Sequence, residues 1–341
     1  MIIRSRAPLR LGLAGGGTDV SPYPETYGGY VLNGTIDRYA YTSICLSDDE
    51  NTYFDALDIQ RSKKVSTKLD IIRDGNLDLH TELYDVIMKE FNNGNYIPLK
   101  VSTFCDAEAG SGLGSSSTLV VSMIQAYVEL LNLPLDYYSI ADLAYRVERL
   151  NCNFHGGKQD QYSATFGGFN FMEFYGDNKT IINPLRLNKR VITELESSLI
   201  LVYTGISRDS SKIIKDQSDS LIKKSTKSLE AMHEIKNHAL SMKECLLTGN
   251  MDGFVESMKK GWENKKKSSS SITNKIINDI YQTAIDAGAL SGKISGAGGG
   301  GYLMLYTPVS NRMDVIRAIN KKGMRVSNCH FVSSGAYSWK P

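Results

Sequence analysis

Residues 110–117 read Gly-Ser-Gly-Leu-Gly-Ser-Ser-Ser, and an apolar run follows them at 118–124. Glycines at alternate positions let the backbone turn tightly and approach a ligand closely, because no Cβ stands in the way. The serines then begin a helix whose first N–H groups lack intrahelical partners and whose dipole favours an anion. This pattern predicts a phosphate-binding loop. It lacks the lysine of the GxxxxGK[ST] loop, and a flexible turn capped by serine is the alternative interpretation.

Two more glycine-rich segments flank this loop in the chain. Residues 7–19 read APLRLGLAGGGTD, and residues 293–302 read KISGAGGGGY. Each pattern alone is common, but the three in this order resemble the three motifs of the GHMP kinases, a family that includes galactokinase, homoserine kinase, mevalonate kinase and phosphomevalonate kinase. The resemblance extends over nearly the whole chain. It implies an ATP-dependent phosphotransferase that acts on an alcohol group.

The resemblance also implies an architecture. We expect an α+β protein of two domains with the active site in the cleft between them. The N-terminal domain, residues 1–175, contains the phosphate-binding loop and should resemble domain 2 of ribosomal protein S5. The C-terminal domain, residues 176–341, should be ferredoxin-like. Composition and spacing alone do not predict these two folds.

The hydrophobic pattern predicts the main elements of both parts. Strands are expected at residues 2–12, 30–46, 99–105, 199–203, 301–306 and 329–334. Helices are expected at residues 81–91, from the phosphate-binding loop to about 133, 138–150, 207–247, 251–267 and 311–321.

The bulk composition excludes several classes of protein. The net charge is +2 in 341 residues, so no global charge directs the chain to nucleic acid or to a membrane. The five cysteines have no CxxC spacing, which argues against a disulfide framework or a zinc site and favours the reducing cytoplasm. The basic runs at 223–224 and 265–267 are interpreted as solvated helix faces. We expect small-molecule partners, no nucleic acid and no membrane, and a homodimer is possible.

Phosphoryl transfer needs a nucleotide site and a metal site. The nucleotide is expected at the loop, on Gly110, Ser111, Gly112, Leu113, Gly114, Ser115, Ser116 and Ser117. Mg²⁺ prefers hard oxygen ligands, few of them from protein. By the family pattern, Ser116 and Glu148 should hold it. A helix cap for Ser116 and a surface carboxylate for Glu148 are the alternatives.

A carboxylate should receive the proton of the acceptor hydroxyl. Residues 156–163, GGKQDQYS, resemble the family segment in which an Asp follows a glycine turn, and Asp160 stands at the matching position. It could act as a base or only orient the hydroxyl; an Asx turn or helix cap is the alternative. The resemblance places Arg10 beside it, where a fixed cation would keep Asp160 ionised and stabilise the transferring phosphoryl group.

The sugar should contact the first and third motifs. Thr18 and Asp19 match the end of the sugar-kinase form of the first motif, and Gly298 and Gly299 belong to the third motif, which should close over the phosphates. Galactokinase has Gly-Glu-His-Thr-Asp where this chain has GGGTD at 15–19, which leaves room for a larger or phosphorylated sugar.

The full first motif resembles the D-glycero-D-manno-heptose 7-phosphate kinase branch, with a neighbouring likeness to fucokinase domains. That branch phosphorylates the anomeric hydroxyl and yields heptose 1,7-bisphosphate for nucleotide-activated heptose and surface polysaccharide. A sugar phosphate needs cations at its far end. Lys158 and Arg208 are the expected cations, and a surface lysine and a helix-start arginine are the alternatives.

Three alternatives to a heptose phosphate kinase stay open. A kinase of an unphosphorylated sugar, similar to fucokinase or galactokinase, would share all three motifs. An inactive homologue could sense a sugar, although Asp160, Ser116 and Glu148 argue for catalysis. A dinucleotide-binding oxidoreductase would need GxGxxG at its first β–α turn, and the loop at 110–117 lies too far along the chain for that.

Overall fold

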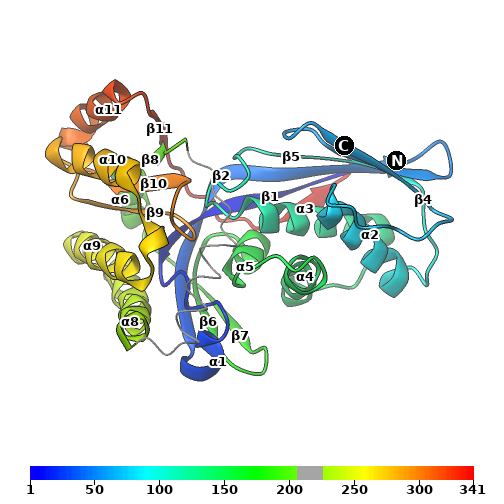
Figure 1. Cartoon of the computed structure of the whole chain (residues 1–341), viewed down its shortest axis with the longest axis horizontal. Helices are drawn as coiled ribbons and strands as arrows, with labels where there is room; N and C mark the ends of the chain where they lie inside the picture. Colours follow the sequence, from blue (N-terminus) through cyan, green and yellow to red (C-terminus); the bar gives the residue numbers. More distant parts are fainter. Residues whose placement is uncertain (206–225) are drawn as a thin grey trace.

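The computed structural model describes residues 1–205 and 226–341, and it consists of two parts built on two β-sheets (Figure 1). The first sheet has the order β12-β1-β2-β5-β3-β4, with β6 paired to β2 and β7 to β6. Its strands are β1 (Ile2–Ala14), β2 (Gly29–Leu46), β3 (Asn51–Ala56), β4 (Arg61–Ser66), β5 (Leu99–Cys105), β6 (Phe169–Phe174), β7 (Thr180–Pro184) and β12 (Tyr337–Trp339). Strands β3 and β5 are parallel, and the other neighbouring strands described in this sheet pair antiparallel.

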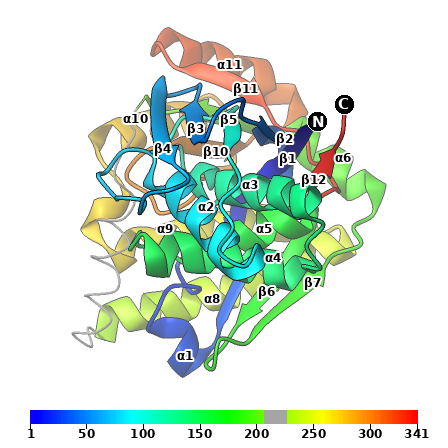
Figure 2. The ribbon, with the colours of Figure 1, turned by 90° about the vertical axis from the view of Figure 1, so that its right-hand side faces the viewer.

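Helices cover one face of the first sheet (Figures 1 and 2). They are α2 (Asp78–Phe91), α3 (Ser115–Leu131), α4 (Tyr137–Tyr145), the π-helical turn η1 (Arg146–Asn151) and α5 (Gln159–Phe166), while the short α1 (Tyr23–Tyr27) follows the first motif. Helix α3 is apolar over most of its length and packs Val120, Val121 and Ile124 into the main core under the sheet. The apolar run that follows the phosphate-binding loop therefore lies at the centre of this part.

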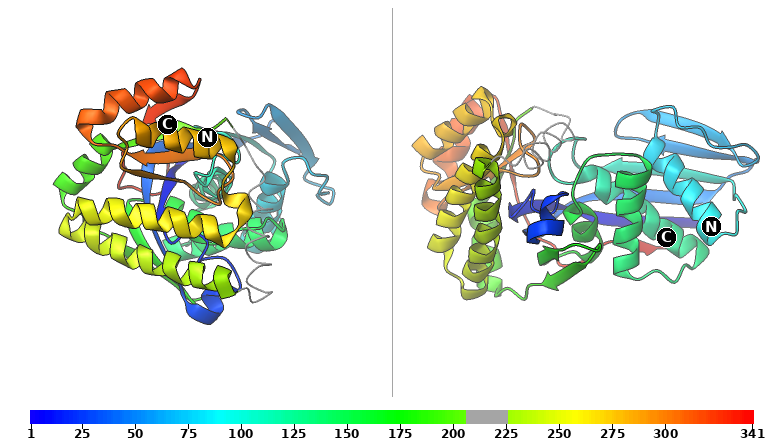
Figure 3. Two further views of the ribbon diagram at one scale, coloured as in Figure 1. Left: turned by 60° about the vertical axis from the view of Figure 1, so that its left-hand side comes forward. Right: turned by 60° about the horizontal axis from the view of Figure 1, so that its bottom comes forward.

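The second sheet has the order β11-β8-β10-β9 and is antiparallel throughout. Its strands are β8 (Leu199–Tyr203), β9 (Ser291–Ile294), β10 (Tyr302–Tyr306) and β11 (Arg325–Asn328). The helices of this part are α6 (Lys189–Ser198), α8 (Thr226–Thr248), α9 (Met251–Ser268), η2 (Ser270–Ile272), α10 (Lys275–Asp286), η3 (Val309–Asn311) and α11 (Arg312–Lys321). Figure 3 shows α8 and α9 packed side by side.

Both faces of the second sheet are buried, as the alternation along β8 shows. Leu199 and Leu201 enter the core shared with α6, α8, α9 and the first sheet, whereas Ile200 and Val202 enter the core under α10 and α11. Successive side chains of a strand point to opposite faces, so a strand covered on both sides reads as a continuous apolar run. The α+β class expected from the sequence is confirmed.

Several predicted elements need correction. The strand predicted at 329–334 is wrong: β11 ends at Asn328, and the chain then crosses from the second sheet to the first, where Phe331 makes one isolated bridge with Ile36. The helix predicted at 138–150 is α4 followed by the wider turn η1. Of the helix predicted at 207–247, residues 207–225 lie outside the described part, and α8 begins at Thr226. Strands β3, β4, β7, β9 and β12 and helices α1, α5, α6 and α10 were not predicted.

The division of the chain at residue 175 stays a prediction. Two strands that follow this point, β7 and β12, pair with the first sheet, β7 through β6 and β12 through β1. The C-terminus therefore returns to the side of the N-terminus (Figure 1). In the part of the chain that the structure describes, no helix is both long and apolar enough to cross a membrane.

Candidate active site

A cavity of about 380 Å³ lies where the three glycine-rich segments meet. Its lining from the first segment includes Arg10, Gly12, Gly16, Gly17 and Asp19. Most of the remaining wall comes from the segments around 110–117 and 148–160. The C-terminal part adds Lys265, Lys293, Gly296 and Ala297. The site is thus built from both parts of the molecule.

The phosphate-binding loop takes its shape from glycines with positive φ. Gly112 and Gly114 have φ of 79° and 81°, a left-handed conformation that a side chain disfavours. A Cβ on Gly112 would lie 2.4 Å from the carbonyl oxygen of Ser295, so this glycine also permits contact with the third segment. Helix α3 begins directly after Gly114, and its first three residues, Ser115, Ser116 and Ser117, line the cavity. The first amides of a helix have no intrahelical partner.

Not every residue of the loop faces the cavity. Gly110, Gly112, Gly114 and the three serines line it, whereas Ser111 and Leu113 do not. Leu113 is buried in the apolar core. The backbone of Ser111 accepts a hydrogen bond from the amide of Tyr302, which connects the loop to β10. These two residues shape the loop, and the other six line the cavity.

Glu148 is fully buried, so the surface-carboxylate interpretation is wrong. Ser116 Oγ donates to Oε1 at 2.7 Å, and Ser117 Oγ donates to Oε2 at 2.6 Å. Gln161 donates to Oε2 at 2.7 Å, and the Arg149 guanidinium lies 3.3 Å from Oε1. Glu148 belongs to the π-helical turn η1, a wider turn that is frequent at functional sites. The structure therefore brings together the two residues expected to hold Mg²⁺.

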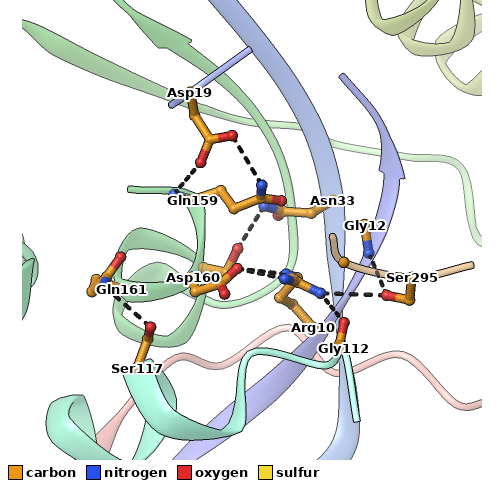
Figure 4. Close-up of polar contacts among 12 residues, drawn as sticks. Arg10, Gly12, Asp19, Asn33, Gly112, Ser117, Gln159, Asp160, Gln161 and Ser295 are labelled. Atoms are coloured by element: carbon orange, nitrogen blue, oxygen red, sulfur yellow. Dashed lines mark hydrogen bonds and ion pairs between the residues drawn. The ribbon is translucent and has the colours of Figure 1, made fainter. Parts of the chain in front are cut away.

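Asp160 and Arg10 also come together, 150 positions apart in sequence (Figure 4). Arg10 Nε and Nη2 lie 2.8 Å and 2.6 Å from Asp160 Oδ1. Arg10 Nη1 donates to the carbonyl of Gly112 at 2.6 Å and to Ser295 Oγ at 3.3 Å. One guanidinium thereby connects β1, the phosphate-binding loop, the third segment and the carboxylate on α5.

Asp19 is buried. In Figure 4, Asp19 and Ser117 lie on opposite sides of Asp160. The Asp19 carboxylate accepts hydrogen bonds from the backbone and side-chain nitrogens of Gln159, both at 3.0 Å. Burial raises the pKa of Asp19, and the neighbouring Asp160 carboxylate raises it further. Thr18 does not line the cavity, because its hydroxyl binds the carbonyl oxygens of Gly15 and Tyr30. Its contacts are those of a residue that closes the turn.

Three more residues expected at the substrate lie away from the cavity lining. Lys158 binds the side-chain oxygen of Asn178 and lies over the ring of Tyr145, at 5.1 Å from the ring centroid. Gly298 and Gly299 pack against Ile272, whose carbonyl accepts a bond from Gly299 N at 2.7 Å. Arg208 lies outside the described residues. The neighbours Gly296 and Ala297 line the cavity instead.

Sequence reasoning missed several charged residues of the wall. Lys265 and Lys293 are buried and line the cavity, and Arg149 and His155 lie beside Glu148 and the loop at 154–157. The interpretation of 265–267 as a solvated helix face is therefore wrong for Lys265. In the sequence, only helical geometry indicated that one of these lysines could be buried. Successive side chains of a helix point about 100° apart, so three consecutive lysines cannot all point in the same direction into solvent.

Comparison with known proteins agrees with this geometry. The family description "GHMP kinases N terminal domain" matches residues 78–168, and "GHMP kinases C terminal" matches residues 242–323. The D-glycero-alpha-D-manno-heptose 7-phosphate kinase of Campylobacter jejuni is 42% identical over 338 residues, 99% of each chain. A solved D-glycero-D-manno-heptose 1-phosphate kinase from Bacteroides thetaiotaomicron is 39% identical, with a TM-score of 0.84 over 99% of each chain.

Galactokinase of Lactococcus lactis, solved with galactose, shares the fold at 17% identity, with a TM-score of 0.75 over 98% of this chain and 94% of that one. The predicted two-domain fold is thereby confirmed, together with the family that the three motifs resembled. The chain is a member of the GHMP kinase family and an ATP-dependent phosphotransferase.

Proposed function

We propose that this kinase transfers the γ-phosphoryl group of ATP to the anomeric hydroxyl of D-glycero-D-manno-heptose 7-phosphate. The product would be heptose 1,7-bisphosphate, a precursor of nucleotide-activated heptose for surface polysaccharide. The Campylobacter jejuni kinase named for this substrate supports the choice, at 42% identity over nearly the whole of both chains. The pairing of Arg10 with Asp160 beside the phosphate-binding loop is the structural observation on which the chemistry rests.

Asp160 is suited to accept the proton of the sugar hydroxyl. Arg10 occupies Oδ1, and among the described residues no hydrogen bond reaches Oδ2. Oδ2 is therefore available to the acceptor hydroxyl. As the sugar oxygen bonds to the γ-phosphorus, its proton passes to Asp160 and the bond from phosphorus to the β,γ-bridging oxygen breaks, which leaves ADP. The guanidinium of Arg10, 2.6 Å from Oδ1, would balance the charge of the Asp160 carboxylate before the transfer.

The nucleotide phosphates are assigned to the loop and to the start of α3. Gly112 and Gly114 allow close approach, and the free amides of the helix start favour an anion. Ser116 Oγ and the Glu148 carboxylate form a pair of hard oxygen donors 2.7 Å apart, a donor set that fits Mg²⁺. The ion would neutralise charge on the β- and γ-phosphates.

The Bacteroides structure supports a second candidate substrate. That protein is described as a heptose 1-phosphate kinase, and a 1-phosphate substrate has its phosphate at the other end of the sugar. The two names predict different reacting hydroxyls in the same cavity. A kinase of free fucose or galactose and an inactive sugar-binding homologue are the remaining alternatives.

A coupled assay of ADP formation separates these candidates. The purified enzyme is given ATP, Mg²⁺ and, one at a time, heptose 7-phosphate, heptose 1-phosphate, free heptose, fucose or galactose. We expect the largest kcat/KM with heptose 7-phosphate and a new anomeric phosphate signal in ³¹P spectra of the product. A larger value for heptose 1-phosphate or for a free sugar would contradict the proposal, and no ADP with any of them would favour the inactive homologue.

The cytoplasmic location and the homodimer expected from the sequence stay predictions. Cell fractionation tests the location. Light scattering behind a sizing column tests the dimer.

A further inference from the structure

The charged side chains around the cavity are unequally paired. Arg10 pairs with Asp160, and Arg149 pairs with Glu148. Lys265 and Lys293 are also buried, but within residues 1–205 and 226–341 neither has a carboxylate within ion-pair distance. A buried cation without a counterion is costly, so the wall has positive charge to offer to a bound anion.

The two lysines differ in what their ammonium groups contact. Lys293 Nζ donates to the carbonyls of Gly12 and Leu13, at 2.7 and 3.0 Å, and so holds the end of β1. Lys265 Nζ donates to one carbonyl, that of Gly296, at 2.5 Å. An ammonium group has three donors, which leaves Lys265 two for a ligand. Lys265 is 5% exposed and lines the cavity, so these donors face a site rather than bulk solvent.

Lys265 lies next to the space that Gly16 of the first motif leaves free because it has no side chain. A Cβ placed on Gly16 would lie 3.8 Å from Lys265 Nζ and 3.7 Å from Gln159 Nε2. Gly16 therefore leaves open the volume between an ammonium and an amide donor. Gln159 also binds Asp19, which lies across Asp160 from Ser117 in Figure 4. This volume is therefore next to the residue that contacts Asp19, the carboxylate expected to bind the sugar.

We propose that Lys265, with the turn at Gly16 and Gly17, binds the phosphate that the sugar substrate already has, at the end remote from the reacting hydroxyl. The inference rests on the proposed function and assigns the subsite for which Lys158 and Arg208 were expected. A dianionic phosphate supplies the counterion that the buried ammonium lacks, and charge-assisted hydrogen bonds of this kind are the strong ones. Galactokinase has Glu and His at the positions of Gly16 and Gly17, where a carboxylate would repel such a phosphate.

The test compares Lys265→Met with Lys265→Arg and with a neighbour on the same helix. Lys266 is the matched control, because its side chain is partly exposed and pairs with Glu263 at 2.7 Å. Loss of one charge-assisted bond, about 1.5–3 kcal/mol, corresponds to roughly 10- to 100-fold in affinity. We expect Lys265→Met to lower kcat/KM for heptose 7-phosphate by that factor, with little change for free heptose or in the KM for ATP. Lys265→Arg should recover part of the loss, and Lys266→Met should behave as the wild type.

Equal losses with the phosphorylated and free sugars would show that Lys265 only supports the fold, and no loss with either would also overturn the subsite. Titration calorimetry with heptose 7-phosphate in the absence of ATP separates this inference from the proposed reaction. If the wild type binds heptose 7-phosphate without phosphorylating it, the proposed function fails. Weaker binding of this sugar by Lys265→Met would still support the subsite. Binding equal to that of the wild type would refute the subsite whatever the reaction proves to be.

Discussion

Two nitrogens of Arg10 bind a single oxygen of Asp160, Nε at 2.8 Å and Nη2 at 2.6 Å. The third nitrogen, Nη1, binds the carbonyl of Gly112 in the phosphate-binding loop. The orientation of the carboxylate is thus tied to the loop that would hold the nucleotide. This arrangement leaves Oδ2 of Asp160 for the hydroxyl of the sugar. Substitutions of the two residues can test the contribution of their charge and that of their geometry separately.

Asp160→Asn should remove most turnover, because an amide cannot take the hydroxyl proton. The expected loss in kcat is about 10²- to 10⁴-fold, the usual contribution of a general base. Binding of ATP, measured by calorimetry, should stay close to that of the wild type, since the loop at 110–117 is unchanged. A kcat equal to that of the wild type would remove Asp160 from the mechanism.

Arg10→Lys keeps the charge but loses the planar fork that reaches Asp160 and Gly112 together. One or two charge-assisted hydrogen bonds are lost, so we expect kcat to fall about 10- to 100-fold. Arg4, an exposed arginine near the start of the same strand, supplies the control as Arg4→Lys, which should leave kcat unchanged. Unchanged kcat in Arg10→Lys would show that any cation at this position is sufficient.

Ser116→Ala and Glu148→Gln should each raise the Mg²⁺ concentration needed for half-maximal activity, because each removes or weakens a hard oxygen ligand. Ser115→Ala is the comparison, since Ser115 lines the same cavity but is not a partner of Glu148. Its Mg²⁺ midpoint should match that of the wild type. If the midpoints of Ser116→Ala and Glu148→Gln match it as well, while both stay active, the metal site lies elsewhere.

Gly112→Ala should destabilise the protein and weaken ATP binding, because the new Cβ would lie 2.4 Å from the Ser295 carbonyl oxygen. Gly94→Ala is a matched control: its φ of 75° is close to the 79° of Gly112, but a Cβ there would meet nothing within 4 Å. The left-handed conformation alone costs about 1–2 kcal/mol. The melting temperature should therefore drop further for Gly112→Ala, and only that variant should raise the KM for ATP. Equal effects would show that the contact with Ser295 is unimportant.

The kcat/KM for the sugar phosphate should depend on pH through Lys265. Burial first and the cation of Arg10 second lower the pKa of Lys265 to about 8, while Asp19 acts in the opposite direction. Lys293 also packs nearby, and burial lowers its pKa as well. Below pH 8 the ammonium is protonated and binds phosphate; above pH 8 it loses its proton. We therefore expect kcat/KM for the phosphorylated sugar to decline above about pH 8, toward the value for free heptose.

Lys265→Arg distinguishes Lys265 from the other groups that titrate near it. A guanidinium stays protonated throughout this range, so the decline above pH 8 should disappear in the variant. The profile for free heptose should lack this decline in both proteins. A decline of the same size in Lys265→Arg would assign the titration to another group, of which Lys293 is the nearest buried amine.

The sequence was sufficient for the features that local chemistry dictates. Alternate glycines followed by serines specified the loop and the start of α3, and apolar runs specified β1, β2, β5, β8 and β10. The three motifs in order identified the family, and that resemblance paired Arg10 with Asp160. Weakly apolar segments were missed: β4, with its sequence RSKKVS, lies at an edge and has almost no hydrophobic pattern.

Only the tertiary structure decided which polar side chains enter the cavity. Lys265, Lys266 and Lys267 are adjacent and chemically identical, yet only Lys265 is buried, because the packing of α9 against β9 and β1 covers one direction of the helix. Lys158 is two residues from Asp160 but lies beside Asn178 and Tyr145. Proximity in the sequence does not specify the direction of a side chain, which depends on the elements that pack around it.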